Sequence, residues 1–232
     1  MIKLDEGIVT PHHFNYLSFI SSSGSSDLWL PSEKCQTCST HKTFDSEASS
    51  TYSMVSTSSG NARAFRISYG SGDIAGNVAT DTVTVSTLTL PNVIFGEVTS
   101  EGSTISSFDM DGIVGLAFDG LAVVTEPGIF SMIQSNYANL SQSFSLYLSS
   151  DPDDHTKPSK IMFGYYDLDI VSPDALFFYT PVVRYTSSLT YWTVAMTGFE
   201  IGTTATFTTA ESVLSVFSLC QYGYVNLQFN HT

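Results

Sequence analysis

A serine-rich loop carries the first candidate chemistry of this chain. Residues 19–29 read F-I-S-S-S-G-S-S-D-L-W, and a Ser-His-Asp triad can be assembled on paper from Ser22, His41 and Asp27. In such a triad the histidine takes the serine proton and the aspartate orients the histidine. Nothing in the spacing of these three residues supports the grouping, so we do not expect a nucleophilic serine.

The three cysteines raise two further possibilities. Cys35, Cys38 and His41 could supply three zinc ligands, but no fourth ligand follows at ordinary spacing. A thioredoxin-type redox pair is not expected either, because no β-α-β pattern surrounds the two cysteines. Cys220 has no obvious partner. We therefore expect no metal site and no cofactor.

The elements that must position these residues are mostly strands. Apolar and polar residues alternate over residues 65–69 and 82–85, which is typical of strands with one buried face. Glycine-rich turns separate such runs, as in an antiparallel barrel or sandwich. The sequence therefore predicts an all-β fold.

One helix is predicted, over residues 127–137. Pro127 suits the first helical position, and Ile129, Ile133 and Tyr137 recur on one face. Residues 151–160 are predicted to form an exposed turn or loop. The strand pattern resumes at Lys160 and continues through residues 177–179 and 191–199.

Composition excludes several classes of partner. The 232 residues carry 22 acidic and 8 basic side chains, for a formal net charge of -14. Phosphates would be repelled, so we expect no binding to nucleic acid or to anionic membranes. No run approaches the length of a membrane span, and residues 1–6 show no signal peptide. Asn139 and Asn230 begin sequons and are candidate glycosylation sites.

The serine-rich loop resembles the first active-site loop of pepsin-like aspartic proteases. In that family, hydrophobic residues lead into Asp-Thr-Gly-Ser-Ser-x-Leu-Trp-x-Pro-Ser. The present chain has Ser22 at the position of the catalytic aspartate, Ser23 at the threonine and Gly24 at the glycine. The rest of the loop follows the family pattern through Ser32.

Five more segments match the family in order. Residues 66–83 resemble its flap hairpin, with Tyr69 at the flap tyrosine and a tip at Gly70, Ser71 and Gly72. Residues 111–118 read D-G-I-V-G-L-A-F, similar to the strand behind the catalytic loop, which gives Asp111 a structural role rather than one in a dyad with Asp109. The other three are residues 144–148, Phe163-Gly164 with Asp167, and Tyr191-Trp192.

The resemblance implies the pepsin-like acid protease fold. Residues 1–182 would form a nearly complete N-terminal lobe with inter-lobe strands, and residues 183–232 a fragment of the C-terminal lobe with a divergent tail. Residues 205–214 can be aligned with the second active-site loop, which places Thr208 at the second aspartate. Residues 1–11 offer little of the family's N-terminal hairpin, so we expect unpaired sheet edges.

The resemblance also implies a function. The family hydrolyses peptide bonds with two carboxylates, and neither is present at its expected position here. We therefore expect a catalytically inactive relative that binds peptide or protein ligands under the Tyr69 flap. Two alternatives stay open: an active endopeptidase whose sequence here comes from a faulty or alternative gene model, and a secreted β-rich module that binds some other ligand.

Two further expectations concern compartment and cross-linking. The family often carries a small disulfide loop where Cys35 and Cys38 stand. If the two are paired, the chain folds outside the reducing cytosol. The family resemblance then favours an extracellular or lysosomal location.

Overall fold

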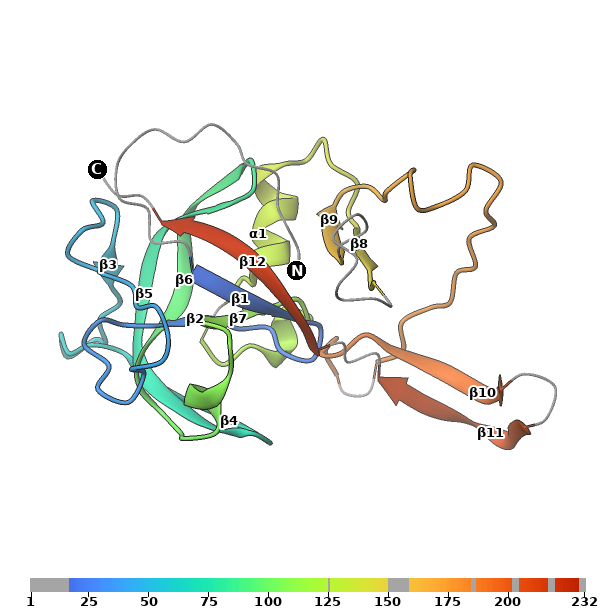
Figure 1. Cartoon of the computed structure of the whole chain (residues 1–232), viewed down its shortest axis with the longest axis horizontal. Coiled ribbons are helices and arrows are strands. Elements are labelled where there is room, and N and C mark those ends of the chain that lie inside the picture. Colours follow the sequence, from blue (N-terminus) through green and yellow to red (C-terminus); the bar gives the residue numbers. More distant parts are fainter. Residues whose placement is uncertain are drawn as a thin grey trace.

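The alternating runs fold into strands that surround one short helix (Figure 1). The computed structural model describes residues 17–124, 126–149, 159–184, 187–201, 205–216 and 220–229. The strands are β1 Leu17–Ser22, β2 Leu28–Pro31, β3 Ser53–Met54, β4 Ala64–Tyr69, β5 Gly72–Val85, β6 Leu88–Glu101, β7 Gly112–Gly115, β8 Phe144–Tyr147, β9 Lys160–Phe163, β10 Thr193–Ile201, β11 Ala205–Val216 and β12 Cys220–Phe229. The helix is α1, Ile129–Asn136. The fold is all-β, as predicted.

One large sheet contains most of the strands. Its order is β12-β1-β7-β2-β6-β5-β3, with β4 paired to β5. A further pairing of β12 with β5 closes the path from β12 through β1, β7, β2, β6 and β5 back to β12. Two smaller two-stranded sheets stand beside it, β8 with β9 and β10 with β11. The β10–β11 hairpin extends away from the large sheet (Figure 1).

The strands next to the serine-rich loop are buried on both faces. In β1, Phe19 belongs to one apolar cluster and Ile20 to the other, because successive side chains point to opposite faces. In β2, Leu28 and Leu30 join the first cluster while Trp29 joins the second. The first cluster also contains the buried face of α1, and the second lies under the β4–β5 hairpin. This double packing fixes the backbone on either side of the loop.

The predicted helix starts later than expected. Pro127 is not helical, and α1 begins at Ile129, with Gly128 as an extended N-cap. Asp119 supplies the capping oxygen from outside the helix, accepting hydrogen bonds from the Gly128 N–H and the Ser131 hydroxyl, each at 3.0 Å. Ile129 and Ile133 are buried, as the periodicity predicted.

Some of the other sequence-based predictions are confirmed and some are wrong. Alternating burial along β4 and along the end of β5 is confirmed. Residues 177–179 form no strand, and the Phe178 and Tyr179 side chains are exposed, because no described strand pairs with them. The unpaired sheet edges expected from the short N-terminal segment are not found at β1, which pairs with β12 on one side and with β7 on the other. The predicted loop over residues 151–160 lies largely outside the described residues.

Membrane insertion through a helix finds no support in the described part of the chain. The only α-helix among these residues, α1, has eight residues, and none of their helices is long and apolar enough to cross a membrane.

Candidate functional site

A pocket of about 330 Å³ lies between the β4–β5 hairpin and the loop that follows β1. Apolar side chains form most of its wall, and hydroxyl groups and glycine backbone form the rest. The lining residues are Ile20, Ser22, Gly24, Ser25, Trp29, Tyr69, Gly70, Ser71, Ile105, Phe108, Met110 and Ile113. The predicted loop residues Ser22 and Gly24 therefore meet the predicted hairpin residues Tyr69, Gly70 and Ser71 at one pocket, whereas Gly72 is not among its lining residues.

The loop at residues 22–27 is held by backbone hydrogen bonds from the segment after β7. The Leu116 N–H donates to the Ser22 carbonyl at 2.7 Å, and the Ala117 N–H donates to the Ser25 carbonyl at 2.9 Å. Within the loop, the Gly24 N–H donates to the Ser22 hydroxyl oxygen at 3.3 Å. The Ser22 side chain thus has a fixed place at the pocket, with only 2% of the residue exposed.

Gly115 allows this close approach. A Cβ atom at this position would lie 2.2 Å from the Ser26 carbonyl carbon, so no larger residue fits without a backbone shift. The Gly115 N–H donates to the Asp27 carbonyl at 3.0 Å. Strand β7 therefore packs directly against the loop that it supports.

Asp27 is a buried carboxylate close in sequence to Ser22, but it does not line the pocket. Its Oδ1 accepts hydrogen bonds from the Val124 N–H at 2.7 Å and from the Val123 N–H at 3.0 Å. These bonds bind the loop to the turn before α1. The grouping of Ser22, His41 and Asp27, which the spacing did not support, is not formed, because His41 contacts Glu101 and the Phe108 carbonyl instead.

The β4–β5 hairpin covers the pocket through Tyr69. The Trp29 indole Nε1–H donates to the Tyr69 hydroxyl oxygen at 3.0 Å, linking the hairpin to the buried strand β2. Residues 70 and 71 form the turn, and Gly72 has a φ of 137°, a conformation that favours glycine. The tyrosine is thereby positioned beside the pocket that also contains Ser22.

No described residue among those lining the pocket carries a charged side chain. Asp109 is exposed, and Asp111 accepts a hydrogen bond from the Lys42 N–H at 2.8 Å. Asp111 thus has the structural contact that the family resemblance favoured. The pocket can bind apolar groups and exchange hydrogen bonds through hydroxyls, but its lining holds no side chain that is a base in acid.

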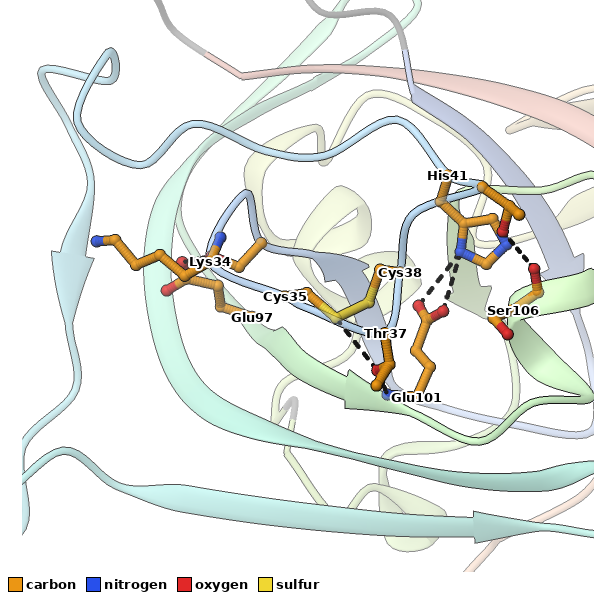
Figure 2. The surroundings of a disulfide bond; sticks show 10 residues. Lys34, Cys35, Thr37, Cys38, His41, Glu97, Glu101 and Ser106 are labelled. Atoms are coloured by element: carbon orange, nitrogen blue, oxygen red, sulfur yellow. Dashed lines mark hydrogen bonds and ion pairs between the residues drawn. A yellow bond between two sulfur atoms is a disulfide. The ribbon is translucent and has the colours of Figure 1, made fainter.

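His41 and Glu101 form a buried ion pair (Figure 2). The His41 Nδ1 lies 3.1 Å from Oε2 and 3.3 Å from Oε1 of Glu101, and the two side chains are 1% and 0% exposed. The His41 Nε2 lies 3.1 Å from the carbonyl oxygen of Phe108, a pocket-lining residue. His41 therefore joins the end of β6 to the segment that carries Ile105 and Phe108.

Both ring nitrogens of His41 face oxygen acceptors, so the protonated ring satisfies both contacts. The hydrogen bond to Glu101 raises the pKa of His41, the negative charges of Glu101 and Asp111 add to the increase, and burial opposes it. The Thr37 hydroxyl accepts a hydrogen bond from the Glu101 N–H at 2.7 Å. Glu101 is thus tied to the loop that contains Cys35 and Cys38.

Cys35 and Cys38 form a disulfide, as the resemblance implied (Figure 2). Sulfurs joined in this way cannot act as thiolate ligands for zinc. Among the described residues, no group of three or more His, Cys, Asp or Glu side chains is arranged to hold a metal ion.

The remaining predicted residues lie apart from the pocket lining. Ser23 is buried in the loop, at 5% exposure. Thr208 lies in β11, where its backbone is paired with Gly198 of β10. Asn139 is exposed after α1, and Asn230 lies outside the described residues.

Sequence reasoning missed the wall formed by Ile105, Phe108 and Met110. It also missed the pairing of His41 with Glu101, since 60 positions separate them and no local pattern links them. A signal for the wall did exist, because these apolar residues directly precede the D-G-I-V-G segment.

An all-β unit with a hairpin over a pocket, and a Gly-Ser-Ser loop at its floor, defines the pepsin-like class of lobe. The family model described as eukaryotic aspartyl protease matches residues 11–216. The chain belongs to this family.

Its relatives include cathepsins and pepsin. Rat cathepsin E is 36% identical over 191 residues, covering 81% of this chain and 45% of the relative. Chicken pepsin A is 34% identical over 202 residues, with 85% and 51% covered. Cathepsin D of Dictyostelium discoideum is 35% identical over 187 residues, with 78% and 45% covered. The chain thus spans about half the length of the curated relatives it matches.

Proposed function

We propose that this chain is a peptide-binding member of the family that does not hydrolyse peptide bonds. The observation that carries the proposal is the place of Ser22. It lies at the end of β1, in the pocket, at the position where the loop resemblance puts the catalytic aspartate. Ser23 and Gly24 take the next two positions of the motif, and Thr208 takes the aspartate position of the second loop.

The chemistry of the family requires carboxylates. In aspartic proteases two aspartates share a proton, so that one accepts a proton from water and the other donates to the substrate carbonyl. A serine hydroxyl can bind a water, but it is not a useful proton acceptor in acid. General acid-base catalysis contributes about 10²–10⁴ in rate, and this contribution would be lost.

Peptide binding does not require those carboxylates. The pocket offers an apolar wall for a side chain, and the hydroxyls of Ser22, Ser25 and Tyr69 can make hydrogen bonds with a peptide backbone. The hairpin tip at residues 70–72 would lie against the ligand. Residues 1–182 would supply this half of the cleft, and residues 183–232 the beginning of the second lobe.

A hydrolysis assay at acidic pH tests the proposal that the chain does not cleave peptide bonds. The purified chain, shown to be folded by circular dichroism, is incubated with a denatured protein substrate, with and without a statine-type inhibitor. We expect no inhibitor-sensitive cleavage. Such cleavage would refute the proposal and favour the active endopeptidase.

Binding is tested separately with a fluorescently labelled statine-type inhibitor, followed by anisotropy. Tyr69→Ala removes the hydroxyl that accepts from Trp29 and opens the pocket, so we expect affinity to fall at least about tenfold, or about 1.4 kcal/mol. Tyr179→Ala is the matched control, because Tyr179 is 90% exposed and outside the pocket lining. Equal affinity in both variants would mean that the inhibitor does not bind under Tyr69, and it would contradict the proposed site.

The disulfide supports a proposal about the compartment. Cys35–Cys38 favours folding in an oxidising environment, since such bonds are rare in the cytosol. We propose an extracellular or lysosomal location, and glycosylation of Asn139 would be consistent with that route. The chain is expressed in a eukaryotic host, and its electrophoretic mobility before and after glycosidase treatment measures the glycosylation.

A further inference from the structure

The closed path of the large sheet depends on one segment, β12. It pairs antiparallel with β1 at five positions, from Leu17 opposite Leu227 to Ser22 opposite Cys220. It also pairs antiparallel with β5 at three positions, from Val85 opposite Leu227 to Val83 opposite Phe229. Figure 1 shows β12 lying along β1 and reaching β5.

Both neighbours of β12 are already paired on their other side. Strand β1 pairs with β7, and residues 83–85 of β5 pair with β6. Without β12, each would present a row of backbone N–H and C=O groups without strand partners. Strand β12 bridges them, with residues 220–227 along β1, residues 227–229 along β5, and Leu227 paired on both sides. An extended peptide can bind such strand edges, with main-chain hydrogen bonds supplying affinity.

The rest of the C-terminal part does not hold β12 in place through strand pairing. The preceding strands, β10 and β11, pair with each other and with no other described strand. Their hairpin extends away from the large sheet (Figure 1). Among the described strands, β12 is therefore attached only through β1 and β5, and it can leave without unpairing any other strand.

We propose that the groove between β1 and β5 is a strand-binding site for an extended peptide, and that its occupant is the chain's own segment Cys220–Phe229. The register also relates the groove to the pocket loop. Because Cys220 lies opposite Ser22, the bound strand ends at the residue that begins the pocket loop. This proposal concerns a different surface from the pocket and does not depend on peptide binding there.

Disulfide trapping tests whether the segment occupies the groove. Ser22→Cys places a thiol opposite the native Cys220, and Ser21→Cys with Gln221→Cys, in a Cys220→Ser background, tests the adjacent pair. Adjacent antiparallel pairs alternate between wider and closer spacing, so one of the two has the closer Cβ atoms that a disulfide needs. We expect an intramolecular link in at least one variant by peptide mass spectrometry.

Ser23→Cys is the matched control, since Ser23 lies beyond the end of β1 and is not among the positions paired with β12. We expect much less linkage there. Absence of a link in both test variants would overturn the proposal. A link between two copies, visible as a covalent dimer, would also overturn the assignment of the chain's own segment.

Exchange tests whether the groove accepts a strand from outside. A specific protease site is introduced at residues 217–219 of the full chain, the site is cut, and a labelled synthetic peptide with the sequence of residues 220–229 is added. We expect the labelled peptide to replace the resident one and co-elute with the chain. A peptide with proline in place of Val225 should bind at least about tenfold more weakly, because proline lacks the backbone N–H. Equal binding of both peptides would overturn the strand-pairing mode.

Discussion

The buried pair of His41 and Glu101 should make folding stability depend on pH. His41 has a raised pKa in the folded state, above its ordinary value of 6.5. Between that value and the folded value, the native state binds more protons than the unfolded state. The stabilisation is therefore complete below about pH 6.5 and is lost as the pH rises through the folded pKa.

The structure sets the size of the effect. One extra bound proton gives a slope of at most about 1.4 kcal/mol per pH unit within this window. His41→Ala leaves the Glu101 carboxylate buried, with 0% of its side chain exposed and its ring partner gone. Removing one member of a buried pair costs about 3–5 kcal/mol. Since domains have about 5–15 kcal/mol of stability, the variant should be severely destabilised.

Urea unfolding followed by tryptophan fluorescence, at about pH 5.5 and about pH 8.5, measures the pH dependence of stability and the cost of His41→Ala. The parent chain should lose stability between the two, while Glu101→Gln should show a smaller loss because its amide carries no charge to hold the proton on His41. Glu47→Gln is the control, since the Glu47 side chain is 79% exposed and pairs with Lys34 at 3.7 Å. It should stay within about 0.5 kcal/mol. Equal pH slopes in the parent and Glu101→Gln would refute the reasoning.

Three other changes have defined outcomes. Replacing Cys35 and Cys38 by serine should lower the free energy of unfolding by about 2 kcal/mol, the loop-closure value for so short a ring, as measured by urea titration. Gly115→Ala should cost about 1–3 kcal/mol or more and lower the melting temperature, because its Cβ would lie 2.2 Å from the Ser26 carbonyl carbon. Asp27→Ala should cost about 1–3 kcal/mol for the buried amide that loses its acceptor, whereas Asp27→Asn, which keeps an acceptor oxygen, should cost less in the same unfolding assay.

Local patterns in the sequence predicted the strands well. The pairing of strands that lie far apart in the sequence was predicted least well. The alternation over residues 65–69 indicated β4 because the burial of one face is written into every second residue. The start of α1 was misplaced because its cap comes from Asp119, outside the helix. The segment at residues 177–179 has strand-like residues but no pairing partner among the described strands.

In the candidate site, too, local motifs were predicted and long-range pairing was not. The Gly-Ser-Ser motif and Tyr69 were found from the sequence because each lies within a short recognisable segment. The role of β12 could not be predicted, since antiparallel pairing between residues about 200 positions apart leaves no local signal.

The contacts that hold the pocket loop explain how such a loop can persist without a catalytic carboxylate. The Ser22 and Ser25 carbonyls accept from the segment after β7, and Asp27 accepts from the turn before α1. Two of these bonds join backbone atoms on both sides, and the others are accepted by the side chain of Asp27, which does not line the pocket. Replacing an aspartate side chain at position 22 leaves every one of them possible. Apart from the bond that the Gly24 N–H donates to the Ser22 hydroxyl, these contacts do not use the side chain of residue 22. They are therefore compatible with the proposal that the pocket keeps its shape while the chemistry is lost.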